Sequence, residues 1–167
     1  MDDIAELHKY KKILVTGTQR SGTTIVARII ASDLGYKYFD ENAIGVSNVE
    51  KLQNLVKHDN IVIHCPAVSY KIHEFDGNDT AVVFVLRSKG DVLKSQKRIG
   101  WTGAREKREL KKYGASIGDC VYDVKLKFWR EKQKSRVNGF EVQYESFASH
   151  PMFYSDRNGW ANRQWRP

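Results

Sequence analysis

The stretch that decides the fold runs from residue 12 to residue 24 and reads Lys-Ile-Leu-Val-Thr-Gly-Thr-Gln-Arg-Ser-Gly-Thr-Thr. Its first part, Lys12 to Thr16, is a short run of β-branched and apolar residues, which predicts a buried strand. Its second part, Gly17 to Thr24, is a loop of small and polar residues. From Thr23 the apolar residues recur at helical spacing, and Gly35 follows as a C-cap. We therefore expect a strand, a tight loop and a helix in direct succession.

This loop has the features of an anion-binding site. A turn of small residues at the start of a helix exposes consecutive backbone N–H groups, which attract phosphate. The spacing from Gly17 to Thr24 is that of a Walker A loop, G-x4-G-x-[ST], with Thr23 at the lysine position. Because that lysine contacts the β- and γ-phosphates of a nucleoside triphosphate, its replacement weighs against a kinase. Arg20 supplies a cation three positions earlier. The structural alternative is a plain strand-to-helix turn, with Ser21 or Thr23 as an ordinary cap.

Strand and helix patterns alternate along the rest of the chain. Apolar runs predict further strands at 36–39, 60–64, 81–86 and 140–144, the last of them after a turn at Asn138-Gly139. Helical patterns occupy 48–58, with Ser47 as N-cap, and also 91–99 and 122–135. Residues 100–118 combine glycines with many charges and indicate a loop with a mobile helix.

This alternation predicts a single α/β domain over residues 1–167. Strands separated by helices favour a three-layer α/β/α architecture around a central parallel sheet with right-handed crossovers. Residues 1–11 form an N-terminal arm in this interpretation, and residues 152–167 form an irregular tail. Ligands bind beyond the carboxyl ends of the strands in such sheets. The rule points to 17–24, 64–66, 87–88 and 144–146 as one site.

The composition favours an anionic partner. The 167 residues include 28 Lys and Arg against 20 Asp and Glu, which gives a formal net charge of +8. Nucleic acid, an acidic membrane and a phosphorylated nucleotide all fit that charge, but no RNP-like or zinc-finger signature supports nucleic acid. We expect no membrane span and no secretory signal. Two cysteines, Cys65 and Cys120, are too few for a disulfide scaffold or a structural zinc site, so we expect a cytoplasmic protein without such a zinc site.

Four stretches together resemble one family. Arg20 to Thr24, after a strand, resembles the 5′-phosphosulfate-binding loop of the sulfotransferases that use 3′-phosphoadenosine 5′-phosphosulfate (PAPS). In the family's 3′-phosphate-binding segment an arginine ends a strand and a serine follows eight residues later on a helix, as Arg87 and Ser95 do here. Val142 to Pro151 is similar to the family's late strand, whose tyrosine, here Tyr144, lies by the adenine. Ile61 to Pro66 resembles the strand end that supplies the catalytic histidine of the cytosolic branch, here His64.

The resemblance spans about residues 13 to 151 and implies a P-loop fold of the sulfotransferase type. It implies metal-independent transfer of a sulfuryl group from PAPS to a hydroxyl acceptor, which leaves the desulfated nucleotide PAP. The residues that it assigns to the nucleotide are Arg20, Ser21, Gly22, Thr23, Thr24, Arg87, Ser95 and Tyr144. The chain is short for this family, and Val62 stands where the family has a lysine. The family's C-terminal basic loop has only a weak counterpart, Arg157 to Trp160.

Sulfuryl transfer needs a base for the proton of the acceptor hydroxyl, and two residues are candidates. His64 lies at the carboxyl end of its strand, and an imidazole titrates near neutral pH. Glu41 follows Arg20 by 21 residues, a placement similar to that of the catalytic glutamate in the protein-tyrosine branch of the family. Arg20 completes the catalytic set, because its cation and the N–H groups of the loop would stabilise the phosphate that leaves.

Two other classes of protein remain open alternatives. One is a small P-loop nucleoside or nucleotide kinase that uses ATP and magnesium, with Asp40 or Glu41 beside the substrate hydroxyl. The other is a non-catalytic nucleotide-binding protein of the same fold. The sequence leaves the acceptor open among sugars, small alcohols, phenols and peptide tyrosines, and it leaves the oligomeric state open as well.

Overall fold

A five-stranded parallel sheet in the order β2-β3-β1-β4-β5 forms the centre of the molecule. We describe it from a computed structural model, which covers residues 2–45, 48–101 and 103–153. The strands are β1 (Lys12–Gly17), β2 (Lys37–Phe39), β3 (Ile61–His64), β4 (Thr80–Leu86) and β5 (Asn138–Gln143). All neighbouring pairs are parallel. The central strands β1, β3 and β4 are buried along nearly their whole length, as their continuous apolar runs predict.

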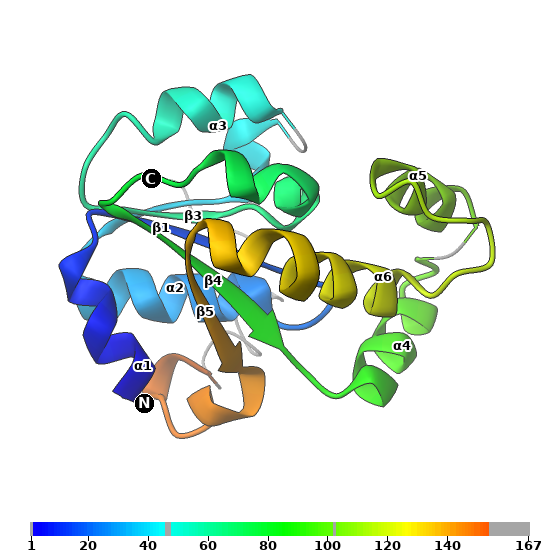
Figure 1. Cartoon of the computed structure of the whole chain (residues 1–167). Helices are drawn as coiled ribbons and strands as arrows, with labels where there is room; N and C mark the ends of the chain where they lie inside the picture. The colour runs from blue at the N-terminus through cyan, green and yellow to red at the C-terminus, as the bar shows by residue number, and fades with distance from the viewer. Residues whose placement is uncertain (1, 46–47, 102, 154–167) are drawn as a thin grey trace.

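Helices cover both faces of this sheet (Figure 1). α1 (Asp2–Ala5), the helical turn Glu6–Lys9 and α2 (Thr23–Leu34) pack on one face, where Leu7 is buried. α3 (Val49–Leu55), the 3-10 turn Pro66–Glu74 and α6 (Val121–Phe128) cover the other face. α4 (Lys89–Arg98) and α5 (Ala104–Lys112) lie beyond the carboxyl end of β4. The expected three-layer α/β/α architecture with a parallel sheet is therefore confirmed.

The predicted turn at Asn138-Gly139 is wrong, because both residues belong to β5 and pair with Ala81 and Val82. Asn138 Nδ2 donates to the carbonyl oxygen of Thr80 at 2.9 Å, so this side chain fastens the start of the strand. A Cβ on Gly139 would lie 3.0 Å from the ring of Trp129. The asparagine and the glycine thus serve close strand packing rather than a turn.

The predicted helix over 122–135 is interrupted. α6 ends at Phe128 and continues as a π-helical turn, Trp129–Gln133. The ring of Trp129 is buried and stacks on Phe84 at 5.1 Å between centroids. Gln133 is buried as well, and its Nε2 donates to the carbonyl oxygen of Ser69. Within the wider turn, Trp129 thus packs against the sheet and Gln133 against the turn Pro66–Glu74.

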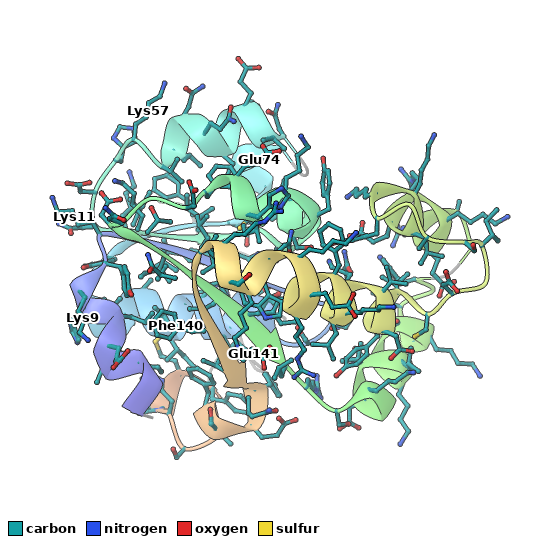
Figure 2. The ribbon with its side chains drawn as sticks, viewed as in Figure 1. Lys9, Lys11, Lys57, Glu74, Phe140 and Glu141 are labelled. Carbon is teal, nitrogen blue, oxygen red and sulfur yellow. The ribbon has the colours of Figure 1, made fainter. Side chains whose placement is uncertain are left out.

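Neighbouring residues of β5 make different contacts on the two faces of the sheet. Phe140 and Glu141, labelled in Figure 2, are neighbours in β5, so their side chains point to opposite faces. Phe140 packs edge-on against Tyr10, on the α2 side. Glu141 accepts hydrogen bonds from Trp129 Nε1 and from Arg130, on the α6 side.

Two helix starts also differ from expectation. Asn48 is the N-cap of α3, with its side-chain oxygen accepting from the Lys51 N–H at 3.0 Å. The expected cap, Ser47, lies outside the described residues. Ser88 caps α4, which therefore starts at Lys89 rather than at residue 91. Of the expected C-terminal tail, residues 152 and 153 are helical, and 154–167, with Arg157 to Trp160, lie outside the described residues. In the part of the chain that the structure covers, no helix is long and apolar enough to cross a membrane.

Candidate nucleotide-binding site

The loop between β1 and α2 is held in shape by its own polar groups. The hydroxyl of Ser21 donates to the carbonyl oxygen of Thr18 at 2.8 Å, and the backbone N–H of Ser21 donates to the same oxygen. Arg20 has a φ of 73°, in the left-handed region that non-glycine residues rarely adopt. Such strain persists where surrounding contacts enforce it, and it is concentrated at functional sites. Ser21 thus shapes the loop from inside.

Gly22 is the point where the loop meets the carboxyl end of β5. Its φ of 90° is left-handed, and a Cβ there would lie 2.1 Å from Cδ2 of the Tyr144 ring. The aromatic ring of Tyr144 therefore packs directly on the backbone of the loop. Only glycine permits both this conformation and this contact.

We predict that Gly22→Ala lowers the free energy of unfolding by more than Gly35→Ala does. Gly35 also has a left-handed φ, 67°, but no described atom lies within 4 Å of a Cβ built there. Left-handed strain costs roughly 1–2 kcal/mol in both variants, whereas only the Gly22 variant must displace a ring. Urea unfolding of the two variants measures the difference. Equal losses would show that Tyr144 moves away without cost.

The first turn of α2 offers free donors at this end of the sheet. The N–H groups at the start of a helix have no acceptors within the helix, and α2 begins at Thr23. A cavity of about 790 Å³ opens beside this turn. Of the eight residues that the sequence assigns to the nucleotide, seven line this cavity, and Ser21 is the exception among them. The cavity extends from the loop across the carboxyl ends of β4 and β5 to the face of α4.

Positive charge dominates the cavity wall. Arg20, Arg87, Lys94 and Arg98 line it, against the single carboxylate of Asp91. Burial lowers the pKa of Arg20, and the neighbouring Arg98 and Arg87 lower it further by repulsion. Like charges gathered in one partly buried cavity favour an anionic ligand.

Two hydrogen bonds connect the loop 17–24, called the phosphate loop below after its predicted role, to the α4 side of the cavity. Arg20 Nε donates to Ser95 Oγ at 3.0 Å. Arg87 lies with its guanidinium 4.5 Å from the centre of the Tyr144 ring, and its Nη1 donates to the carbonyl oxygen of Arg20 at 3.4 Å. Among the described residues, nothing accepts from the buried Nε of Arg87. A buried donor of this kind fits a site whose anion completes the hydrogen bonding.

The two candidate bases lie behind the loop rather than in the cavity wall. His64 is 5% exposed, and its Nε2 lies 2.8 Å from Thr23 Oγ1 and 3.4 Å from Thr24 Oγ1. Its Nδ1 lies 3.7 Å from Oδ2 of Asp40. Glu41 follows Asp40, and burial raises the pKa of its carboxyl, although His64 and Lys125 oppose that rise. Of the two candidates, His64 contacts the hydroxyls of the phosphate loop.

Sequence reasoning missed a buried ion cluster beneath the loop. The ammonium of Lys125, whose side chain is fully buried, donates to Glu109 Oε1 at 3.2 Å, Gln19 Oε1 at 3.1 Å and the carbonyl oxygen of Pro66 at 3.0 Å. Gln19 Nε2 donates in turn to Glu109 Oε1 at 3.0 Å. The cluster therefore ties α5, α6 and the end of β3 to the phosphate loop. The signal was a lysine four residues after the apolar Val121, on the buried face of α6.

Lys94 and Arg98 were also missed. They line the cavity together with Asp91 and Ser95. Arg98 lies three residues after Ser95 and four after Lys94, and this spacing places Arg98 on the helix face of both. Ser95 could therefore have identified Arg98, and Arg98 in turn Lys94.

No family model matches this sequence, and no curated protein matches it either. Solved structures are similar in fold. Shikimate kinase from Bacteroides thetaiotaomicron is 12% identical with a TM-score of 0.53, over 92% of this chain and 99% of that one. The YorR protein of Bacillus subtilis, solved in complex with phosphorylated GDP, is 13% identical with a TM-score of 0.51, over 92% and 99%. Mouse sulfotransferase SULT7A1, complexed with PAP, is 14% identical with a TM-score of 0.49, over 98% and 64%.

At these identities the comparison shows the fold alone, and the statement about the fold rests on the first two structures. The chain has a three-layer α/β/α fold of the P-loop type, which kinases share. The activity has to be argued from the residues of the site.

Proposed function

We propose that the protein is a sulfotransferase that binds PAPS and transfers its sulfuryl group to a hydroxyl acceptor. One observation carries this proposal: a single cavity joins the N-terminus of α2 to Arg87 and Ser95. A nucleotide with an anionic group at its 5′ position and a phosphate at its 3′ position would place the first at the N-terminus of α2 and the second at Arg87 and Ser95. The replacement of the Walker lysine by Thr23 supports this nucleotide over ATP.

In this proposal the two ends of the cavity hold different groups of the nucleotide. The N–H groups of Gly22, Thr23 and Thr24 bind the 5′-phosphosulfate at the start of α2. Arg87, through its buried Nε, and Ser95 bind the 3′-phosphate. Tyr144, which lines the cavity and packs against both Gly22 and Arg87, contacts the adenine.

The chemistry requires the transfer of one group and one proton. The acceptor oxygen forms a bond to sulfur while the bond from sulfur to the bridging phosphate oxygen breaks, and the acceptor proton passes to a base. Charge grows on the departing phosphate oxygen, as in phosphoryl transfer. Arg20 and the N–H groups of the loop stabilise that charge.

We assign the base role to His64. Its Nε2 lies behind the loop, and the hydroxyl of Thr23, a residue that lines the cavity, lies 2.8 Å from it. The proton reaches the imidazole through this hydroxyl, which accepts one proton and donates its own. No metal takes part in this scheme, because the transferred sulfuryl group carries less charge than a γ-phosphate.

Arg87→Ala tests the assignment of the 3′-phosphate. Loss of a charge-assisted contact worth roughly 1.5–3 kcal/mol should weaken PAP binding about 10- to 100-fold. AMP lacks only the 3′-phosphate, so its affinity should change little. Calorimetric titration of the variant with both ligands measures this difference.

Lys97→Ala is the matched control, because Lys97 is an exposed cation of α4 and is not among the cavity-lining residues that the structure describes. It should bind PAP nearly as the unmodified protein does. Equal losses for PAP and AMP in Arg87→Ala would show that the arginine acts on the fold rather than on the 3′-phosphate.

A further inference from the structure

A chain of polar side chains runs from the end of β2 to the first turn of α2. The hydroxyl of Tyr38 donates to Asp40 Oδ2 at 2.9 Å. The same carboxylate oxygen faces His64 Nδ1 at 3.7 Å, and His64 Nε2 lies 2.8 Å from Thr23 Oγ1. The imidazole therefore has a carboxylate on one side and the phosphate loop on the other.

Asp40 is fixed in place and ionised. Its Oδ1 accepts from the backbone N–H of Asn42 at 3.1 Å and from Asn42 Nδ2 at 2.9 Å. The imidazole of His64, followed by the donors of Asn42 and Tyr38, holds the pKa of Asp40 well below its usual range, against the opposing effect of burial. The carboxylate thus presents negative charge to the ring at neutral pH.

The carboxylate decides which ring nitrogen of His64 carries the proton. Nδ1 is buried, and within the described ranges no group forms a hydrogen bond with it; Asp40 Oδ2 faces it at 3.7 Å. A lone pair on Nδ1 would face the charge of Asp40, whereas an N–H there is attracted to it. Nε2 is then the unprotonated nitrogen and accepts a hydrogen bond from Thr23 Oγ1.

We propose that Asp40 is a positioning residue that holds the proton of His64 on Nδ1 and so keeps Nε2 as an acceptor toward the hydroxyls of Thr23 and Thr24. The contribution of Asp40 to catalysis rests on the proposed function, because only an unprotonated Nε2 can accept the proton of the acceptor alcohol. The tautomer itself does not depend on any activity. The proposal can therefore fail or hold separately from the sulfotransferase assignment.

The first test is the side-chain nitrogen NMR spectrum of the unmodified protein at neutral pH. The spectrum distinguishes a protonated ring nitrogen from an unprotonated one. We expect a proton on Nδ1 and none on Nε2. A neutral ring with its proton on Nε2, or a doubly protonated ring, would overturn the proposal.

Asp40→Asn should reverse the tautomer. In the unmodified protein both donors of Asn42 point at Oδ1 of Asp40. The amide that replaces the carboxylate should therefore keep its oxygen at that position and turn its NH2 group toward Tyr38 and His64. An NH2 group facing Nδ1 demands an unprotonated nitrogen, and the proton moves to Nε2. An unchanged tautomer in a folded variant would contradict the role of Asp40.

Asp33→Asn is the matched control. Asp33 Oδ1 lies 3.1 Å from Nε2 of His150, in a second Asp–His pair that is more exposed. This variant should change the signals of His150 and leave those of His64 as they were. If PAPS turnover is measurable, Asp40→Asn should lower kcat toward the level of a variant without the imidazole while the affinity for PAP stays nearly constant. A loss of turnover with an unchanged His64 tautomer would assign Asp40 a different role.

Discussion

His64→Ala should lower the rate of sulfuryl transfer by roughly 10²- to 10⁴-fold, the usual contribution of a general base. The affinity for PAP should remain nearly the same, because His64 lies behind the loop and is not among the described residues that line the proposed nucleotide cavity. Turnover with PAPS and an active hydroxyl acceptor gives the first quantity. Calorimetric titration with PAP gives the second.

Glu41→Gln is the matched comparison. Glu41 is the alternative base, and burial raises the pKa of its carboxyl, so a rate that depended on its ionised form would fall as the pH drops through that raised value. We expect this variant to retain turnover within a few-fold. If Glu41→Gln loses the rate and His64→Ala keeps it, the base is Glu41. If both keep it, the acceptor loses its proton to another group.

Lys125→Met should lower the free energy of unfolding by roughly 3–5 kcal/mol, the usual cost of breaking a buried ion pair. The ammonium is the shared donor to Glu109, Gln19 and the carbonyl oxygen of Pro66. Its removal deprives the buried carboxylate of Glu109 of a positive charge and of a hydrogen-bond donor. Urea unfolding at neutral pH measures the loss.

Lys127→Met is the control for that variant, because Lys127 lies in the same helix with an exposed side chain. Its effect should stay within about 0.5 kcal/mol. The double variant with Glu109→Gln should lose less than the sum of the two single variants. Equal stability of the Lys125 and Lys127 variants would show that the buried cluster contributes nothing to the fold.

The strands and the phosphate loop could be predicted because local residues determine them. The apolar run before Gly17 indicated a strand and the spacing after Thr23 indicated a helix, and the structure has both. The direction of the chain at Asn138-Gly139 could not be predicted locally. The glycine there accommodates Trp129 from a helix on the α6 face, and such a contact exists only once the fold has formed.

The grouping of the candidate site could be predicted for the same reason. Arg20 in the loop and Arg87 at a strand end belong to motifs that predict a shared site, and both residues line the same cavity. The roles of Asp40 and Lys125 depend on partners far along the chain, His64 and Glu109, and no spacing in the sequence relates those pairs. Because a lysine within a basic stretch is normally solvated, the sequence did not indicate that Lys125 is buried.

Calorimetric titration of the unmodified protein with PAP and with ATP, each with and without magnesium, tests the central claim most directly. Four cations, Arg20, Arg87, Lys94 and Arg98, line the cavity, and the loop has Thr23 where a nucleoside-triphosphate kinase has lysine. We therefore predict that PAP binds without magnesium and more tightly than ATP under either condition. Tight, magnesium-dependent binding of ATP with no binding of PAP would contradict the sulfotransferase assignment and favour a kinase.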